Sequence, residues 1–149
     1  AVVFLKRMSD YSARRATITD IRSSDSEGDQ IDGLPEHIKK DVAVKRLNGP
    51  LFFGFTSHFR EMISELPDLK YFIIRMERVP FVDQSGVYAL EATIEELNSR
   101  GIQVIISGAN NRVLHHLRRM KLIPGVLEEK WVFRSFKECR DWLNAGTRS

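Results

Sequence analysis

The sequence predicts an α/β domain in which α-helices cover a mixed β-sheet. Short runs rich in β-branched residues, typical of buried strands, occur at 71–76 and 102–106. Segments with apolar residues at helical spacing alternate with these runs, at 55–66, 87–97 and 112–121. Such alternation is typical of right-handed crossovers that place helices over a sheet. The chain has 149 residues, 42% of them apolar, which is enough for one hydrophobic core.

The N-terminal part is predicted to lie outside the main domain, which we place at 16–149. Residues 1–15 are predicted as a membrane-proximal linker helix, because apolar residues 1–5 precede Lys6 and Arg7, as at the cytoplasmic end of a membrane helix. A helix packed on the domain is the alternative. Residues 16–21 alternate as a half-buried strand does, and the acidic segment 20–40 is predicted to be a solvated loop or insertion. No apolar run approaches the roughly 20 residues that span a bilayer.

The first half of the domain is predicted to begin with a hairpin. Residues 41–47 form the first strand, Asn48-Gly49 is a strong two-residue hairpin signal, and 50–53 form the returning strand. The helix at 55–66 follows, with Thr56 or Ser57 as its N-cap and Pro67 marking its end.

The second half continues the alternation to the end of the chain. The helix at 87–97 ends near Gly101, and Asn110 or Asn111 is the expected N-cap of the next helix. Residues 131–133 are predicted as the last strand. Ser135 and Glu138 then form a capping box that begins a helix with an apolar face.

The turn at 82–86, between a predicted strand and a helix, is the main candidate site. Ser85 is expected to be the N-cap of the helix, and Gly86 allows a close bend. The same position favours negative charge, so that a phosphate on Ser85 would be stabilised by backbone N–H groups and would change docking of a partner. Asp83 would then be a turn acceptor or a like-charge neighbour. The partner loop is therefore predicted to comprise Asp83, Gln84, Ser85 and Gly86.

A basic helix is the second candidate site. Residues 112–121 carry six basic or histidine side chains and no acid, and the expected patch comprises Arg112, His115, Arg118 and Arg119. Such a face suits anionic lipid headgroups, an acidic partner or a nucleotide. The alternative is an ordinary solvated helix face. The net charge of +3 is too balanced to indicate a nucleic-acid binder.

Enzymatic and metal sites are not expected. The sequence contains no phosphate-binding glycine motif, and Cys139 is expected to be a core residue rather than a nucleophile. A single cysteine excludes an internal disulfide. The adjacent His115 and His116 point about 100° apart on a helix, so that they do not share a metal. We therefore predict no catalytic residue, no metal and no cofactor.

The order of these motifs resembles that of a STAS domain, a family named for sulfate transporters and anti-sigma factor antagonists. The resemblance covers residues 40–144 and rests on the strand before Asp83-Gln84-Ser85-Gly86, the helix that follows, the strand at 102–106 and the segment 110–122. It implies the anti-sigma factor antagonist-like fold. In soluble antagonists the serine corresponding to Ser85 is phosphorylated by a partner kinase.

The chain is more similar to the sulfate permease (SulP) branch of this family, because of its leading segment and of residues 51–54 with Phe59. That resemblance implies the cytoplasmic C-terminal domain of an anion transporter, acting as a regulatory and protein-interaction module at the membrane. The implied partners are the transmembrane domain of the same transporter and a cytosolic regulatory protein, with nucleotide as a further ligand at the helix start. A soluble antagonist switched at Ser85 is the alternative. Gln84 departs from the Asp-Ser-Ser-Gly form of that group.

Overall fold

The computed structural model describes residues 34–52 and 55–146, without the side chains of 55–58. The predicted linker helix at 1–15, the strand at 16–21 and most of the acidic segment lie outside these residues. In chain order the described elements are α3 (Glu36–Lys39), β1 (Val42–Asn48), α4 (Phe55–Ser64), β2 (Tyr71–Arg78), α5 (Gln84–Ser99), β3 (Gln103–Ser107), α6 (Asn111–Arg119), α7 (Leu122–Gly125), a 3-10 turn (Glu129–Trp131), β4 (Val132–Phe133) and α8 (Phe136–Gly146).

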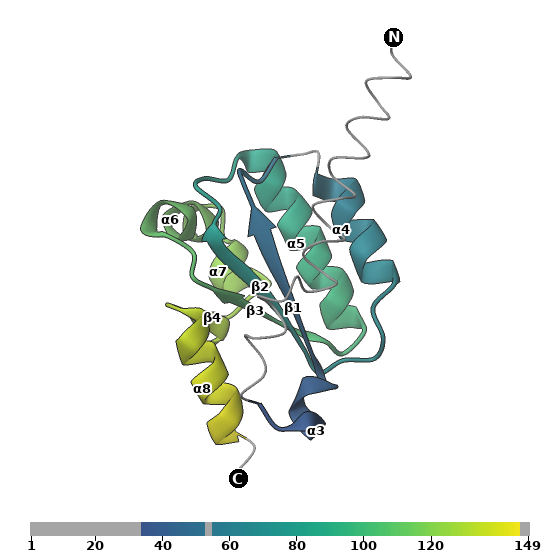
Figure 1. The fold of residues 1–149 in the computed structure, drawn as a ribbon. Helices are drawn as coiled ribbons and strands as arrows, with labels where there is room; N and C mark the ends of the chain where they lie inside the picture. The colour runs from purple at the N-terminus through teal and green to yellow at the C-terminus, as the bar shows by residue number, and fades with distance from the viewer. Residues whose placement is uncertain (1–33, 53–54, 147–149) are drawn as a thin grey trace.

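The strands form one four-stranded sheet in the order β1-β2-β3-β4, with helices on both faces (Figure 1). This confirms the predicted α/β class. All pairings between the named strands are parallel, so that the antiparallel part of a mixed sheet is absent from the described residues. The carboxyl ends of the strands therefore lie at the same edge of the sheet.

The predicted hairpin at Asn48-Gly49 is wrong. Gly49 has a positive φ of 91°, but the chain continues along β2 instead of reversing, and Gly49 N–H donates to the Arg78 carbonyl at 3.0 Å. Leu51 then makes a parallel bridge with Val82. Leu51 is fully buried in this position, and its burial stabilises the extended path.

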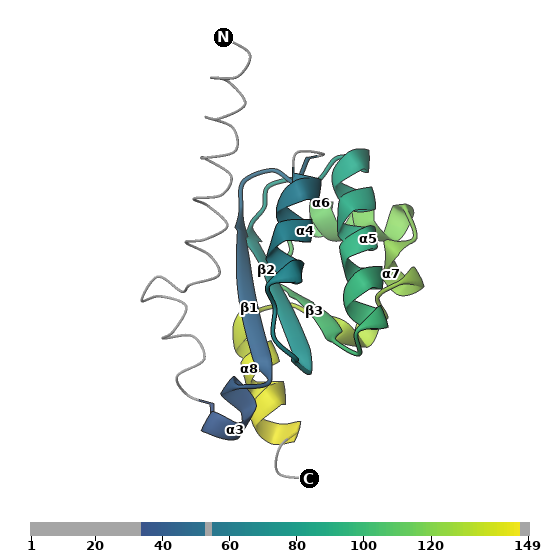
Figure 2. The ribbon, with the colours of Figure 1, turned by 90° about the vertical axis from the view of Figure 1, so that its right-hand side faces the viewer.

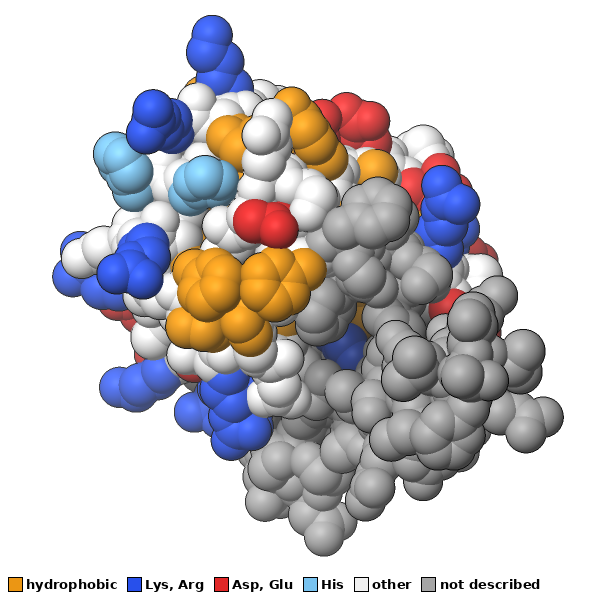
Figure 3. All heavy atoms as spheres, turned by 90° about the horizontal axis from the view of Figure 1, so that it is seen from above, with side chains coloured by type: hydrophobic (Ala, Val, Ile, Leu, Met, Phe, Trp, Pro, Cys, Tyr) orange, Lys and Arg blue, Asp and Glu red, His pale blue; other side chains and the backbone are white. Residues whose placement is uncertain are grey.

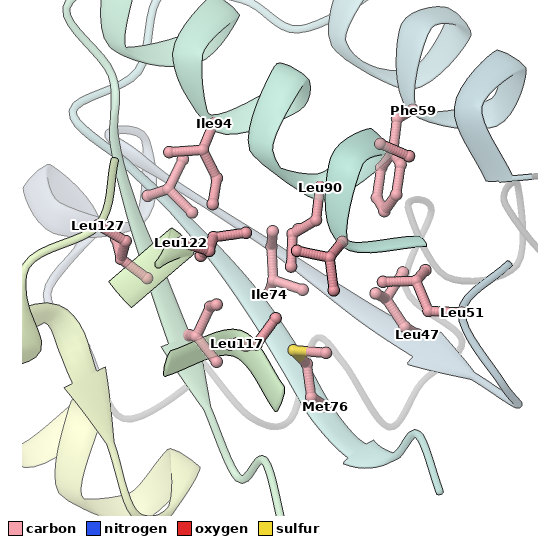
Figure 4. Packing of buried hydrophobic residues seen from close by; sticks show 14 of the residues in the cluster. Leu47, Leu51, Phe59, Ile74, Met76, Leu90, Ile94, Leu117, Leu122 and Leu127 are labelled. Atoms are coloured by element: carbon pink, nitrogen blue, oxygen red, sulfur yellow. The ribbon is translucent and has the colours of Figure 1, made fainter. Parts of the chain in front are cut away.

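The two faces of the sheet carry separate hydrophobic cores. Alternate residues of β2 divide between them, because successive side chains of a strand point to opposite faces. Ile74 and Met76 pack under α4, α5, α6 and α7, where Figure 4 shows them close to Leu90. Ile73 packs under α3 and α8 with Cys139. Figure 2 shows α4 and α5 on one side of the sheet, with α8 and α3 on the other.

The ends of the helices follow the predicted capping in part. Asn110 is the N-cap of α6, since its side-chain oxygen accepts a bond from Val113 N–H at 2.8 Å, as predicted. Ser135 accepts a bond from Glu138 N–H at 3.2 Å, the forward half of the predicted capping box. The caps expected at Thr56 and Ser57 are wrong, because α4 already begins at Phe55.

Two further segments differ from the sequence expectations. The acidic segment 20–40 does not end as a solvated loop, because α3 lies within it and buries Ile38, with Leu34 buried just before the helix. The last strand is shorter than predicted, since Trp131 belongs to the preceding 3-10 turn. Within the described ranges, none of the helices is both long enough and apolar enough to cross a bilayer.

Candidate functional site

The candidate site is the segment that joins β2 to α5 at the carboxyl edge of the sheet. Val79 and Val82 are buried and hold this segment on the core. Val82 bridges Leu51, and Asp83 N–H donates to the Leu51 carbonyl at 3.2 Å. The stretch at 49–52 therefore acts as a brace, which fixes where α5 begins.

Asp83 is the N-cap of α5, so that the prediction of Ser85 as the cap is wrong. Its carboxylate oxygen Oδ1 accepts a bond from Gly86 N–H at 2.7 Å and another from the Ser85 hydroxyl at 2.6 Å. A carboxylate is the better cap, because it accepts both bonds and interacts favourably with the positive end of the helix dipole. Ser85 lies in the first turn, where its hydroxyl donates rather than accepts.

These bonds lower the pKa of the Asp83 carboxyl from its ordinary value. The Ser85 hydroxyl makes the largest contribution, followed by Gly86 N–H, while burial acts in the opposite direction. The site therefore carries a stable negative charge at neutral pH. The Asp83 carboxylate accepts its hydrogen bonds from groups at the start of α5, so that it is not free for proton transfer.

The four predicted loop residues have different degrees of access to solvent. Gln84 is exposed, and Asp83 and Ser85 are half-buried. Gly86 is buried against the brace, where a Cβ atom would lie 2.2 Å from the Leu51 carbonyl oxygen. The lack of a side chain at Gly86 thus permits close packing on Leu51, and the exposed surface of the loop consists of the other three residues.

Exposed aromatic residues surround this loop, and the sequence analysis missed them. Phe52 is 42% exposed, Phe81 37% and Tyr88 55%. The rings of Phe52 and Phe81 contact each other edge to face at 5.5 Å, and Gln84 Nε2 donates to the Tyr88 hydroxyl at 3.1 Å. Figure 3 shows an apolar area on this end of the molecule, next to acidic and histidine side chains. Phe52 had been assigned to the returning strand of the predicted hairpin, so that its exposure was not foreseen.

The predicted basic patch lies on α6, but its members are not equivalent. Arg112, His115 and Arg119 are exposed, and Arg118 is also exposed but binds Glu129 with two bonds of 2.8 and 3.0 Å. This ion pair lowers the pKa of Glu129 and raises that of Arg118. Because both groups are exposed, the pair adds little stability. The charge of Arg118 is compensated by a neighbour that lies outside the predicted patch.

Two further observations concern the nucleophile and metal expectations. Cys139 lies on the buried face of α8, as predicted, and burial raises the pKa of its thiol to about 12, so that little thiolate is present at neutral pH. Within residues 34–52 and 55–146, no three His, Cys, Asp or Glu side chains are grouped to hold a metal ion.

Comparison with known proteins agrees with this geometry. The model of the STAS domain family matches residues 36–139. A probable sulfate transporter 4.2 of Arabidopsis thaliana is 30% identical over 62% of this chain and 16% of its own length. The STAS domain of a SulP transporter from Vibrio cholerae has a TM-score of 0.63 at 30% identity, covering 84% of this chain and 96% of that domain. A sulfate transporter family protein from Wolinella succinogenes has a TM-score of 0.66 at 28% identity, over 73% of this chain and 89% of that one.

The fold and the capped strand-to-helix turn thus define an α/β domain of the STAS type. The chain belongs to the STAS domain family, in the branch found in SulP transporters. It spans about a sixth of the length of the curated plant relative that it matches.

Proposed function

We propose that this chain is the cytoplasmic C-terminal STAS domain of a sulfate or related anion transporter, and that it regulates the transporter through protein contacts. The observation that carries the proposal is that the chain is similar to a SulP transporter STAS domain along 96% of that domain. In addition, the loop at the start of α5 is accessible to a partner. The plant relative is likewise named a probable sulfate transporter. Transport itself would take place in membrane helices, outside the described residues.

The proposed role is binding rather than catalysis. The Ser85 hydroxyl donates a hydrogen bond to the carboxylate that caps the helix, which is an arrangement for fixing a backbone turn. The apolar rings of Phe52 and Phe81 are exposed beside it, as expected of a contact surface.

Ser85 is the proposed switch of this contact. A phosphoryl group on its oxygen would remove the hydrogen bond to Asp83 and place a charge of about −1.5 to −2 beside that carboxylate. Repulsion between the two groups would disturb the N-terminus of α5, where the partner is proposed to dock. The transmembrane domain of the same transporter and a cytosolic protein are the proposed partners.

A soluble antagonist switched at the same serine is the second candidate. The favouring observation is a shared fold, since a putative anti-sigma factor antagonist from Thermotoga maritima superposes with a TM-score of 0.56. Its identity of 13% shows the fold alone, whereas the SulP domains reach 28% and 30%. The transporter proposal therefore has the stronger support.

Uptake of labelled sulfate by cells that express the full-length protein tests the proposal. We expect Ser85→Asp to change the rate of uptake while the purified domain keeps its circular dichroism spectrum and melting temperature. Ser99→Asp, which alters an exposed serine at the other end of α5, is the matched control. Equal uptake by wild type and Ser85→Asp would rule out the switch, and a full-length protein without apolar segments of about 20 residues would rule out the transporter.

A further inference from the structure

The carboxyl edge of the sheet presents a surface that combines exposed aromatic and basic side chains. We call it the aromatic–basic surface and define it by Phe52, Phe81, Tyr88, Arg112, His115 and Arg119. Figure 3 shows hydrophobic side chains on this end of the molecule, with histidine and basic side chains beside them. Its three aromatic residues are the exposed large hydrophobic side chains among the described residues.

The structure fixes the two halves of this surface to each other. Asn110, the cap of α6, donates from its side-chain amide to the carbonyls of Val79 and Pro80, at 3.3 Å in each case. These bonds attach the start of the basic helix to the segment that carries Phe81. The relative positions of rings and cations are therefore set by the fold.

The basic side chains of this surface form one stripe. Arg112, His115 and Arg119 are spaced by three and four residues, which places them on the same side of α6. Arg118 lies on the flank that faces Glu129 and is already paired. Among the residues that the structure describes, no carboxylate forms an ion pair with Arg112 or Arg119. The stripe is thus free to meet an anionic surface.

We propose that the aromatic–basic surface rests on the anionic lipid surface of a membrane. Aromatic side chains enter the interfacial region of a bilayer, while arginines contact anionic headgroups. Neighbouring rings that protrude from loops fit a deformable lipid surface, whereas peptides are bound in grooves or along sheet edges. This inference rests on the proposed function, since membership of a transporter would keep the domain beside the bilayer.

Flotation of the purified 149-residue chain with lipid vesicles tests the inference. Vesicles of phosphatidylcholine are compared with vesicles that contain 40% phosphatidylserine, at roughly 50 and 500 mM salt, where screening differs strongly. We expect binding to the anionic vesicles at low salt and its loss at high salt. Binding to neither kind of vesicle, or equal binding to both, would overturn the inference.

Matched variants identify the surface that binds. Each basic residue near an anionic surface raises the partition constant about fivefold, so that Arg112→Gln with Arg119→Gln should lower it about 25-fold. Phe52→Ser with Phe81→Ser should also weaken binding, because the rings no longer enter the interface. Lys40→Gln with Lys70→Gln is the control, since these exposed lysines precede β1 and β2 and lie at the opposite edge of the sheet.

The failure of this inference differs from the failure of the proposed function. If the control pair lowers binding as much as the Arg112 and Arg119 pair does, the contact is unspecific and the inference is wrong. If the chain binds no lipid while Ser85→Asp still changes sulfate uptake, the lipid contact is refuted and the proposed function stands. If lipid binding holds and uptake is unchanged, the proposed switch fails instead.

Discussion

At the scale of single residues, the site depends on one carboxylate oxygen that accepts two bonds. Both the Ser85 hydroxyl and Gly86 N–H are directed at Oδ1 of Asp83, and together they lower the pKa of that group. The sequence analysis assigned the cap to Ser85 instead, for a reason that is local. Asp83 and Ser85 are both good N-cap residues, and the local pattern does not say which of them lies outside the helix.

The pKa of Asp83 leads to a prediction about pH. Because the carboxyl has a lower pKa in the folded chain than in the unfolded chain, its contribution to stability is present above the ordinary value and is lost as the pH falls through the folded value. Ser85→Ala removes the largest cause, so the Asp83 pKa should rise toward its ordinary value. Carbon-detected NMR titration of the Asp83 carboxyl measures this shift. An unchanged pKa in the variant would show that the hydroxyl does not bind the carboxylate in solution.

Gly86 supports the same site by its lack of a side chain. In Gly86→Ala the new Cβ atom would overlap the carbonyl oxygen of Leu51, which belongs to the backbone and has little room to move. We expect a loss of about 3 kcal/mol or more in the free energy of unfolding, measured with urea.

Gly146→Ala is the control for this substitution. Its Cβ atom would meet no atom within 4 Å, at the end of α8. Its effect should stay within about 1 kcal/mol, because only helix propensity changes. If Gly86→Ala were as mild as this control, the close approach of α5 to the brace at 49–52 would not exist in solution.

At the scale of elements, α6 is positioned by its cap as well as by its apolar face. Val113 and Leu117 are buried, while Asn110 bonds to α6 through its oxygen and to the segment at 79–80 through its amide. The capping was predictable from the sequence, because Asn is a favoured N-cap. The bonds across to Val79 and Pro80 join residues about thirty positions apart, and the local pattern contains no information about them.

Asn110→Ala should therefore destabilise the domain by at least about 1 kcal/mol, the usual loss for an N-cap. Urea unfolding followed by circular dichroism measures the change. Asn111→Ala alters the exposed neighbour within α6 and should shift the free energy of unfolding by less than about 0.5 kcal/mol. Equal effects of the two substitutions would contradict the assigned cap.

At the scale of the whole molecule, the two faces of the sheet differ in the size of their cores. The face under α4 and α5 buries many more described residues than the face under α3 and α8. On the smaller face Trp142 contacts the rings of Tyr71 and Trp131 at 5.5 and 5.4 Å, close to the buried Cys139. A smaller core is expected to open locally before the whole domain unfolds.

The thiol of Cys139 can report on this opening. Its labelling by a disulfide reagent at pH 8 should be slow in the native chain, because the thiol is buried and its pKa is raised to about 12. Trp142→Ala should speed labelling about tenfold for each 1.4 kcal/mol of packing that is lost. Ile63→Ala, on the other face, should leave the labelling rate near that of wild type. An equal acceleration by Ile63→Ala would show that the two faces unfold only together.

The sequence by itself determined the alternation of strands and helices, the fold class and the place of the capped turn. These features follow from local spacing of apolar residues and from cap preferences, which act within a few residues. Only the tertiary structure decided that residues 49–52 run alongside Val82 instead of forming a hairpin, that Arg118 pairs with Glu129, and that Phe52 meets Phe81. The physical reason is that each of these outcomes depends on burial or contact between segments that are distant in the chain, and a local pattern cannot specify which distant segment will be there.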